Sequence, residues 1–337
     1  MGRIVAVTNL KGGIGKTTTV VNVGAGLALK GARVLLVDTD AQGNLAPALG
    51  LQPRRTIYSV LMEQANPLDC LTPARPNLDL LAADDALLTV QAELGQRPGW
   101  VRILETVLAP ARKEYDFIII DVPGSLTVMS ASAIAASSDL LVPTTVEPLS
   151  LKGLDLLFKQ LMRLKNSTRS VRVIVPTMFD GRLRQAQALL SDLQARHGAL
   201  VVEPIRANVR LSEATAEGKT IYEYDRRSRG ALDYAQLVEH LSALWQFAPP
   251  PPTRPAPART NSPPSLPPSV PAPARMNGSL DRSDIPLNPP ATHDTSLPDT
   301  CPNCGRPLNR TTLAGYRVVY CNHCRFKQQG MLLQNRG

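Results

Sequence analysis

Residues 9–18, Asn-Leu-Lys-Gly-Gly-Ile-Gly-Lys-Thr-Thr, have the residue types and the spacing of a loop that binds phosphate. They follow an apolar run at Ile4–Val7 and precede a helix-like stretch from Thr17 to Lys30. Glycines let the backbone N–H groups of such a loop turn towards an anion, and the helix N-terminus adds a favourable partial charge. The glycines of this loop are Gly12, Gly13 and Gly15.

Two side chains of the loop complete the predicted nucleotide site. Lys16 is placed to reach the β- and γ-phosphates, and the hydroxyl of Thr17 is placed to ligate Mg²⁺. The strict phosphate-loop pattern has a glycine at the position of Leu10, and this chain has instead a second lysine, Lys11. Nucleotide binding is therefore predicted, and Lys11 is the informative departure from the pattern.

Carboxylates follow two of the apolar runs. Asp38 and Asp40 come after the run Val34–Val37, and Asp121 comes after Phe117–Ile120. In a parallel sheet such residues emerge at the carboxyl edge, where the phosphate loop also lies. One carboxylate is needed near Mg²⁺ and another to orient the attacking water, so the set predicts a hydrolytic site.

The elements that must position these residues alternate along the chain. The predicted fold is α/β, a P-loop NTPase with a mostly parallel, doubly wound sheet and helices on both faces. A last helix, Ala231–Phe247, is predicted to close the domain with an apolar face that includes Leu232 and Leu241. Further strands are expected at Leu78–Leu81, Leu140–Val142 and Val171–Val175, and further helices at Thr56–Glu63, Val101–Lys113, Gly153–Leu164 and Leu183–Arg196.

Composition divides the 337 residues into three regions. An ATPase-like domain is predicted at 1–248, with 27 Lys/Arg and 24 Asp/Glu. Residues 249–299 hold 16 of the 30 prolines and are predicted to be a disordered linker. No run approaches the roughly 18 apolar residues of a membrane span, and no leader is visible, so a cytoplasmic protein is expected.

The C-terminal region, 300–330, carries two Cys-x-x-C pairs. Cys301 and Cys304 are separated by 16 residues from Cys321 and Cys324, a spacing that predicts a four-cysteine zinc ribbon. His323 is interpreted as a bystander and Cys70 as a packing residue. Residues 301–337 hold six basic and no acidic side chains, so this module is basic, and a protein or a nucleic acid partner fits it equally.

In motif order, the chain resembles the ParA/Soj branch of the deviant-Walker-A ATPases over residues 1 to about 247. The resemblance rests on the loop at 9–18, on V-L-L-V-D-T-D-A-Q-G-N from Val34, on I-I-I-D-V-P-G-S-L from Ile118, and on the segments Asn208–Ala214 and Glu223–Gly230. Ala41, Val122 and Gly124 depart from the family pattern at backbone and packing positions, where they can alter the rate of hydrolysis.

The resemblance implies a role for each matching residue. Lys11 is similar to the signature lysine that crosses a nucleotide-sandwich dimer, and Asp40 to the aspartate that positions the hydrolytic water. Asp38 and Asp121 match acidic residues near Mg²⁺, and Asn208 falls where the family packs the adenine. Lys16 and Thr17 match the loop lysine and the Mg²⁺ ligand, and Thr18 a neighbouring phosphate contact.

The family also implies non-specific DNA binding through basic residues late in the domain. Composition alone leaves this open, because acidic residues are interspersed and a solvated face with ordinary ion pairs is the alternative. The basic residues there are Arg182, Arg184, Arg206, Arg210, Lys219, Arg226, Arg227 and Arg229.

The hypothesis from the sequence is thus a Mg²⁺-dependent, ParA-like ATPase whose ATP-bridged homodimer binds DNA and positions a plasmid, a chromosome or another cargo. A ParB-like partner would stimulate hydrolysis, and the protein would be nucleoid-associated. A membrane role is not expected, because no C-terminal amphipathic helix is evident. The alternative is a nucleotide-gated adaptor that recruits an unknown protein through the tethered zinc ribbon.

Overall fold

A computed structural model provides the coordinates, and they fall into two compact units, residues 1–258 and 259–337. The proline-rich stretch predicted as a linker lies outside the described residues, apart from Asp299. The structure describes residues 2–165, 167–248, 299–302, 304–313, 316–321 and 327–331.

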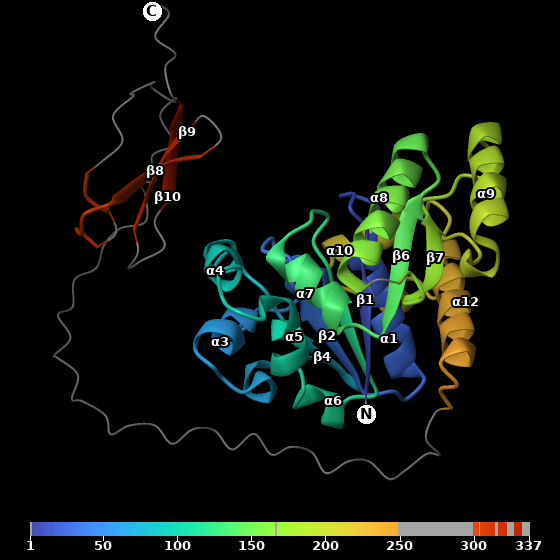
Figure 1. Cartoon of the computed structure of the whole chain (residues 1–337), viewed down its shortest axis with the longest axis horizontal. Helices are drawn as coiled ribbons and strands as arrows, with labels where there is room; N and C mark the ends of the chain where they lie inside the picture. The colour runs from blue at the N-terminus through green and yellow to red at the C-terminus, as the bar shows by residue number, and fades with distance from the viewer. Residues whose placement is uncertain are drawn as a thin grey trace, which may run out of the picture. The chain divides into compact units, whose positions relative to one another are not determined.

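A seven-stranded sheet forms the centre of the first unit (Figure 1). Its strand order is β3-β4-β2-β5-β1-β6-β7. All neighbouring strands are parallel except the edge pair β3 and β4. The α/β, mostly parallel architecture predicted from the sequence is confirmed. The strands are β1 (Arg3–Val7), β2 (Val34–Asp38), β3 (Thr72–Arg75), β4 (Leu78–Leu81), β5 (Phe117–Asp121), β6 (Asp139–Thr145) and β7 (Val171–Thr177).

Helices cover both faces of this sheet (Figure 1). They are α1 (Lys16–Leu29), α2 (Leu45–Ala48), α3 (Ile57–Met62), α4 (Leu87–Leu94), α5 (Ile103–Val107), α6 (Ala111–Glu114), α7 (Val128–Ala136), α8 (Pro148–Lys165), α9 (Arg184–His197), α10 (Val209–Ala216), α11 (Ile221–Tyr224) and α12 (Arg229–Leu244). Short 3₁₀ turns lie at Pro67–Cys70, Trp100–Arg102 and Gly198–Leu200.

Two hydrophobic cores lie on opposite faces of the sheet. Along β1, Ile4 and Ala6 contribute to one core while Val5 and Val7 contribute to the other, as the two-residue period of a strand requires. Helices α3 to α8 pack over the first core, and α1, α2 and α12 pack over the second. Because both faces are covered, β2 and β5 are apolar up to their last residues, Asp38 and Asp121, which lie at the carboxyl edge.

Three expectations about the elements are corrected. The stretch 101–113 is a 3₁₀ turn followed by α5 and α6, because Pro110 lies between the two helices and serves as the N-cap of α6. Helix α8 begins at Pro148, five residues earlier than predicted, as a proline at the first helical position permits. Leu232 does not belong to the buried face of α12, because it is 57% exposed.

The second unit contains a small antiparallel sheet in the order β10-β9-β8. Its strands are β8 (Asn309–Leu313), β9 (Tyr316–Tyr320) and β10 (Lys327–Met331). Strand β9, formed by the run Tyr-Arg-Val-Val-Tyr, is the central one. A tight hairpin at residues 299–308 precedes the sheet, closed by the bond from Leu308 N–H to the carbonyl of Asp299.

Candidate functional site

The loop between β1 and α1 has the conformation of an anion cradle. Gly13 and Gly15 adopt φ angles of 70° and 83°, in the left-handed region that favours glycine. Gly15 is the N-cap of α1, so the first N–H groups of the helix face the loop. A Cβ placed on Gly12 or Gly13 would have no atom within 4 Å, which leaves open space beside the loop backbone.

Lys16 lies at the centre of this loop and is only 9% exposed. Its Nζ donates to the carbonyl oxygen of Lys11 at 2.9 Å. Burial lowers the pKa of Lys16, and the carboxylates of Asp121 and Asp40 oppose that shift. The ammonium is thus held inside the loop, where the negative charge of a phosphate would replace the lost solvation.

The carboxyl group of Asp121 lies close enough to Lys16 to act on its charge. Thr17 Oγ1 donates to Asp121 Oδ2 at 2.6 Å, and Asp121 is 2% exposed at the end of β5. Within the described part of the chain, Asp121 Oδ1 has no hydrogen-bond partner. Burial raises the pKa of Asp121 to about 7, although the hydrogen bond from Thr17 lowers it.

These oxygens fit the hard ligand set that Mg²⁺ requires. A buried carboxylate oxygen without a partner and a neighbouring hydroxyl are the groups that a divalent cation would contact, directly or through water. Mg²⁺ bound here would neutralise phosphate charge and lower the cost of ionising Asp121. The predicted roles of Thr17 and Asp121 are consistent with this geometry.

Asp38 binds backbone N–H groups and does not line the cavity. It is fully buried, and its two carboxylate oxygens accept from the N–H groups of Asp40 at 2.9 Å and Leu45 at 3.0 Å. It therefore fixes the turn that carries Asp40. Asp40 in turn accepts from Gln42 N–H at 3.0 Å, and this arrangement holds its carboxylate at the cavity wall.

A cavity of about 520 Å³ joins these groups. Gln42, Asn44, Ser125 and Met178 line it and were not predicted from the sequence. The first three follow the aspartate motifs directly, which is the signal that could have found them. Its lining is Gly12, Gly13, Gly15, Lys16, Thr17, Thr18, Asp40, Gln42, Asn44, Asp121, Val122, Pro123, Gly124, Ser125 and Met178.

Lys11 and Asn208 lie outside this lining. Lys11 Nζ donates to Ser150 Oγ at 2.7 Å and to Glu147 Oε2 at 3.0 Å, next to the start of α8. Asn208 is the N-cap of α10, where its side chain accepts from Arg210 N–H at 3.0 Å. The two lysines of the loop therefore hold different positions, one inside the cavity and one bound to residues 147–150.

Gly124 lies directly against the phosphate loop. A Cβ at this position would stand 3.1 Å from Gly12 N and 3.1 Å from Lys16 Nζ, closer than ordinary van der Waals contact. The glycine therefore lets the segment after β5 approach the loop backbone. This gives a steric account of glycine at position 124, where the chain departs from the family pattern.

Comparison with known proteins places this site in a family. A family model for an AAA domain matches residues 2–173. The chromosome partitioning protein ParA of Caulobacter vibrioides is 36% identical over 249 residues, which cover 71% of this chain and 93% of that protein. The sporulation initiation inhibitor protein Soj of Bacillus subtilis is 36% identical over 251 residues, 72% of this chain and 99% of Soj. The chain belongs to the ParA/Soj family of P-loop ATPases.

A solved structure agrees with this assignment. The cobyrinic acid a,c-diamide synthase of Mycobacterium smegmatis, crystallised with ADP and magnesium, aligns with a TM-score of 0.63 and 31% identity over 73% of this chain and 96% of that one. As a member of the ParA/Soj family the chain is an ATP hydrolase, and ATP with Mg²⁺ suits the cradle and the carboxylate described above. No helix in the described ranges is long and apolar enough to span a membrane.

The basic residues late in this ATPase unit are all exposed. Four of them form ion pairs: Arg182 with Asp180, Arg206 with Asp233, Arg210 with Glu213, and Lys219 with Glu217. Among the described residues no ion pair involves Arg184, Arg226, Arg227 or Arg229. The positive charge of the region is thus partly neutralised within the chain, and partly available to an anionic partner.

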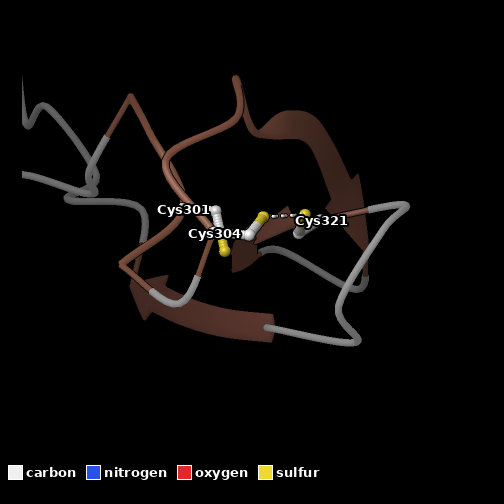
Figure 2. Close-up of side chains that lie close together, drawn as sticks. All are labelled: Cys301, Cys304 and Cys321. Atoms are coloured by element: carbon white, nitrogen blue, oxygen red, sulfur yellow. Dashed lines mark hydrogen bonds between the residues drawn. The ribbon is translucent and has the colours of Figure 1, made fainter. Parts of the chain in front are cut away.

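The sequence predicted that four cysteines of the second unit lie together, and the structure shows this for three of them. Cys301, Cys304 and Cys321 come together, and Cys324 lies outside the described residues (Figure 2). Cys70 is 2% exposed in the core of the ATPase unit, so its prediction as a packing residue is confirmed.

Proposed function

We propose that the chain is a partition ATPase whose ATP-bound homodimer binds DNA without sequence preference. The observation that carries the proposal is that the two lysines of the loop have different positions and partners. Lys16 serves the cavity of its own chain, whereas the Nζ of Lys11 lies outside it, bound to Glu147 and Ser150. A lysine outside the cavity of its own chain can exchange these two contacts for a second nucleotide, the one held by a partner copy.

The chemistry within one copy follows from the residues of the cavity. The loop N–H groups and Lys16 bind and orient the phosphates, and Thr17 with Asp121 holds Mg²⁺, which offsets their charge. The carboxylate of Asp40, fixed by the turn that Asp38 supports, positions the water that attacks the γ-phosphate in line. A ParB-like partner would accelerate this step and so return the dimer to monomers.

The proposed contact for the adenine is Met178, which lines the cavity. Met178 is 53% exposed there and has a φ angle of 54°, unusual for a residue other than glycine. Ala207 N–H donates to the carbonyl of Phe179, so Asn208 follows a segment bonded to the one that carries Met178. The predicted adenine role of Asn208 is compatible with this placement.

DNA binding is proposed for the exposed basic residues of α9 to α12. Arg210 lies on α10, Lys219 on the connection to α11, and Arg227 and Arg229 around the start of α12. Each residue that contacts a phosphate releases counterions, so affinity should fall steeply with salt. A cytoplasmic protein that associates with the nucleoid follows from this proposal.

A binding experiment tests the proposal with matched variants. Arg210→Ala removes an i,i+3 ion pair with Glu213, and Arg102→Ala removes the same kind of pair with Glu105 elsewhere on the chain. Anisotropy of a random-sequence duplex, measured with ATP and Mg²⁺ over a salt series, should show weaker binding for Arg210→Ala only. Because a dimer carries two copies, the salt slope should fall by about 2.

The lysine variants separate binding of nucleotide from dimer formation. Lys16→Ala should reduce ATP affinity by roughly tenfold or more, because a charge-assisted contact is lost. Lys11→Ala should still bind ATP, but light scattering should find a monomer that no longer retains DNA. Wild-type protein with ATP that leaves DNA unbound at low salt, or a Lys11→Ala variant that dimerises normally, would overturn the proposal.

The second candidate, an adaptor that recruits a protein through its C-terminal module, is favoured by the cysteine cluster. It requires that the partner bind to the second unit and not to the ATPase unit. A pull-down with the full chain and with a Cys304→Ser variant distinguishes the two, since a partition partner should be retained by both.

A further inference from the structure

Three cysteine sulfurs converge in the second unit from two separate segments. The Sγ atoms of Cys301, Cys304 and Cys321 all lie within 4.8 Å of one another (Figure 2). The distance from Cys304 Sγ to Cys321 Sγ is 3.5 Å. Residues that are 17 apart in sequence thus place their sulfur atoms in contact.

The spacing of these sulfurs suits a metal better than a disulfide. A disulfide needs an S–S bond of about 2.05 Å, well below the 3.5 Å between Cys304 and Cys321. Four thiolates around Zn²⁺ at about 2.3 Å stand about 3.8 Å apart at the corners of a tetrahedron. The observed separation therefore matches the edge of such a tetrahedron closely.

The backbone around the first pair has the shape of a metal-binding knuckle. Gly305 N–H donates to the carbonyl of Cys301 at 2.8 Å, and Cys301 N–H donates to the carbonyl of Arg306 at 2.8 Å. Gly305 has a φ angle of 69°, which a side chain would strain. These bonds reverse the chain within a few residues and bring Cys301 and Cys304 to one side of a tight turn.

The sequence supplies a fourth ligand at the corresponding place of the second pair. Cys321 directly follows β9, and Tyr320 pairs with Lys327 at the start of β10. Cys324 belongs to the six-residue connection between these paired positions.

We propose that the second unit holds a structural Zn²⁺ ion through Cys301, Cys304, Cys321 and Cys324. Four thiolates close the coordination sphere, so the ion has no open position for substrate and stabilises the fold instead. The six basic and no acidic side chains of residues 301–337 favour the ionised thiols, because a four-thiolate Zn²⁺ site carries a charge of about −2. The proposal stands whether or not the ATPase unit binds DNA.

The small size of the second unit explains why it would need a metal ion to be stable. Three strands of five residues and one hairpin offer little apolar surface to bury, although Val319 is 1% exposed. Structural zinc contributes folding free energy directly in modules of this size, because the site does not exist in the unfolded chain. The ion is expected to join the knuckle at 301–304 to the β9–β10 hairpin.

Metal analysis of the full chain, purified from zinc-supplemented cells, tests the proposal. Wild-type protein should carry about one zinc ion per chain, whereas Cys304→Ser and Cys321→Ser should lose most of it. Two matched controls should keep their zinc: Cys70→Ala, which removes the one cysteine of the ATPase unit, and His323→Ala, which changes the neighbour of Cys324. The unfolding transition of the ATPase unit in the same samples checks that the variants are folded.

Cobalt replacement and thiol counting give independent readouts. Co²⁺ added to the metal-free chain should produce thiolate charge-transfer absorption and the intense visible bands of a tetrahedral site. Cys324→Ser should weaken both signals. Wild-type protein that stays well below one zinc after reconstitution, a Cys304→Ser variant that retains the metal, or a disulfide among these cysteines in protein purified anaerobically would each overturn the proposal.

Discussion

At the scale of single residues, two aspartates that look equivalent in the sequence have different hydrogen-bond partners in the site. Asp38 and Asp121 end neighbouring strands in direct register, yet Asp38 binds two backbone N–H groups while Asp121 faces Thr17 and the cavity. One carboxylate therefore builds the turn, and the other is available to the cation. The motif pattern places both near the phosphate loop, but only the three-dimensional packing assigns these different partners.

The buried Asp38 predicts a pH dependence of stability. Burial, with the nearby charge of Asp121, raises the pKa of Asp38 to about 8. The unfolded chain keeps an ordinary value near 3.9, so the folded state binds the proton more tightly between these limits. The stabilisation is complete below the unfolded pKa and is lost as the pH rises through the folded one.

The melting temperature of the nucleotide-free, Mg²⁺-free protein should therefore fall between about pH 4 and about pH 8. Asp38→Asn should be less stable at low pH, because it loses one acceptor, but its melting temperature should fall less steeply with pH. Asp121, whose pKa burial also raises, would account for the slope that remains. Equal slopes in wild type and variant would contradict the assignment.

At the scale of elements, helix α12 shows how the period of a helix decides which apolar residues are buried. Its sequence suggests one apolar face that includes both Leu232 and Leu241, but Leu241 is fully buried and Leu232 is 57% exposed. The buried leucine packs in the core that α1 and α12 share over the sheet. Leu232 lies nine residues before Leu241, about 180° around the helix at roughly 100° per residue. It therefore faces away from that core, while its neighbours Ala231 and Asp233 are buried.

These two leucines form a matched pair for a stability measurement. Leu241→Ala should reduce the free energy of unfolding by about 2–5 kcal/mol, because it leaves a cavity in a packed core. Leu232→Ala should change it by no more than about 0.5 kcal/mol, since the side chain is mostly in solvent. Urea unfolding of both variants gives the comparison. Similar losses for the two would mean that Leu232 is covered in solution.

Six of the seven strands of the ATPase unit could be predicted, and β3 could not. The central strands read as apolar runs because both of their faces are buried, whereas β3 (Thr72–Arg75) lies at the sheet edge and contains Pro73. The helix expected at 101–113 failed because Pro110 interrupts it. Periodicity identified the long elements, and short edge or interrupted elements required the tertiary fold.

The candidate site divides in the same way. The phosphate loop, Asp40 and Asp121 could be found from the sequence, because their chemistry depends on local spacing. Met178 could not, because it reaches the cavity only through the position of β7 beside β6. Nor does any sequence pattern show that Lys11 binds Glu147 and Ser150, residues more than 130 positions away.

At the scale of the whole molecule, the chain combines two compact units, for which we propose different ligands. The hydrophobic clusters described for the ATPase unit use residues from Ile4 to Trp245, with Phe247 packed at their edge. The second unit has three short strands and the cysteine cluster. A ligand stabilises only the structure that binds it, so nucleotide and zinc should act on separate unfolding transitions.

Calorimetry of the full chain checks this independence. Addition of ATP and Mg²⁺ should raise the main transition, which reports the ATPase unit, by several degrees, since ligand at about 100 times its Kd adds about 2.7 kcal/mol. Removal of zinc with a chelator, in nucleotide-free buffer, should abolish the order of the second unit and leave the main transition within about 1 °C. The variant Cys304→Ser should reproduce the chelator result without any change of buffer. A main transition that falls by several degrees on loss of zinc would show that the two units are coupled in stability, because the core of the ATPase unit would then depend on the metal of the other.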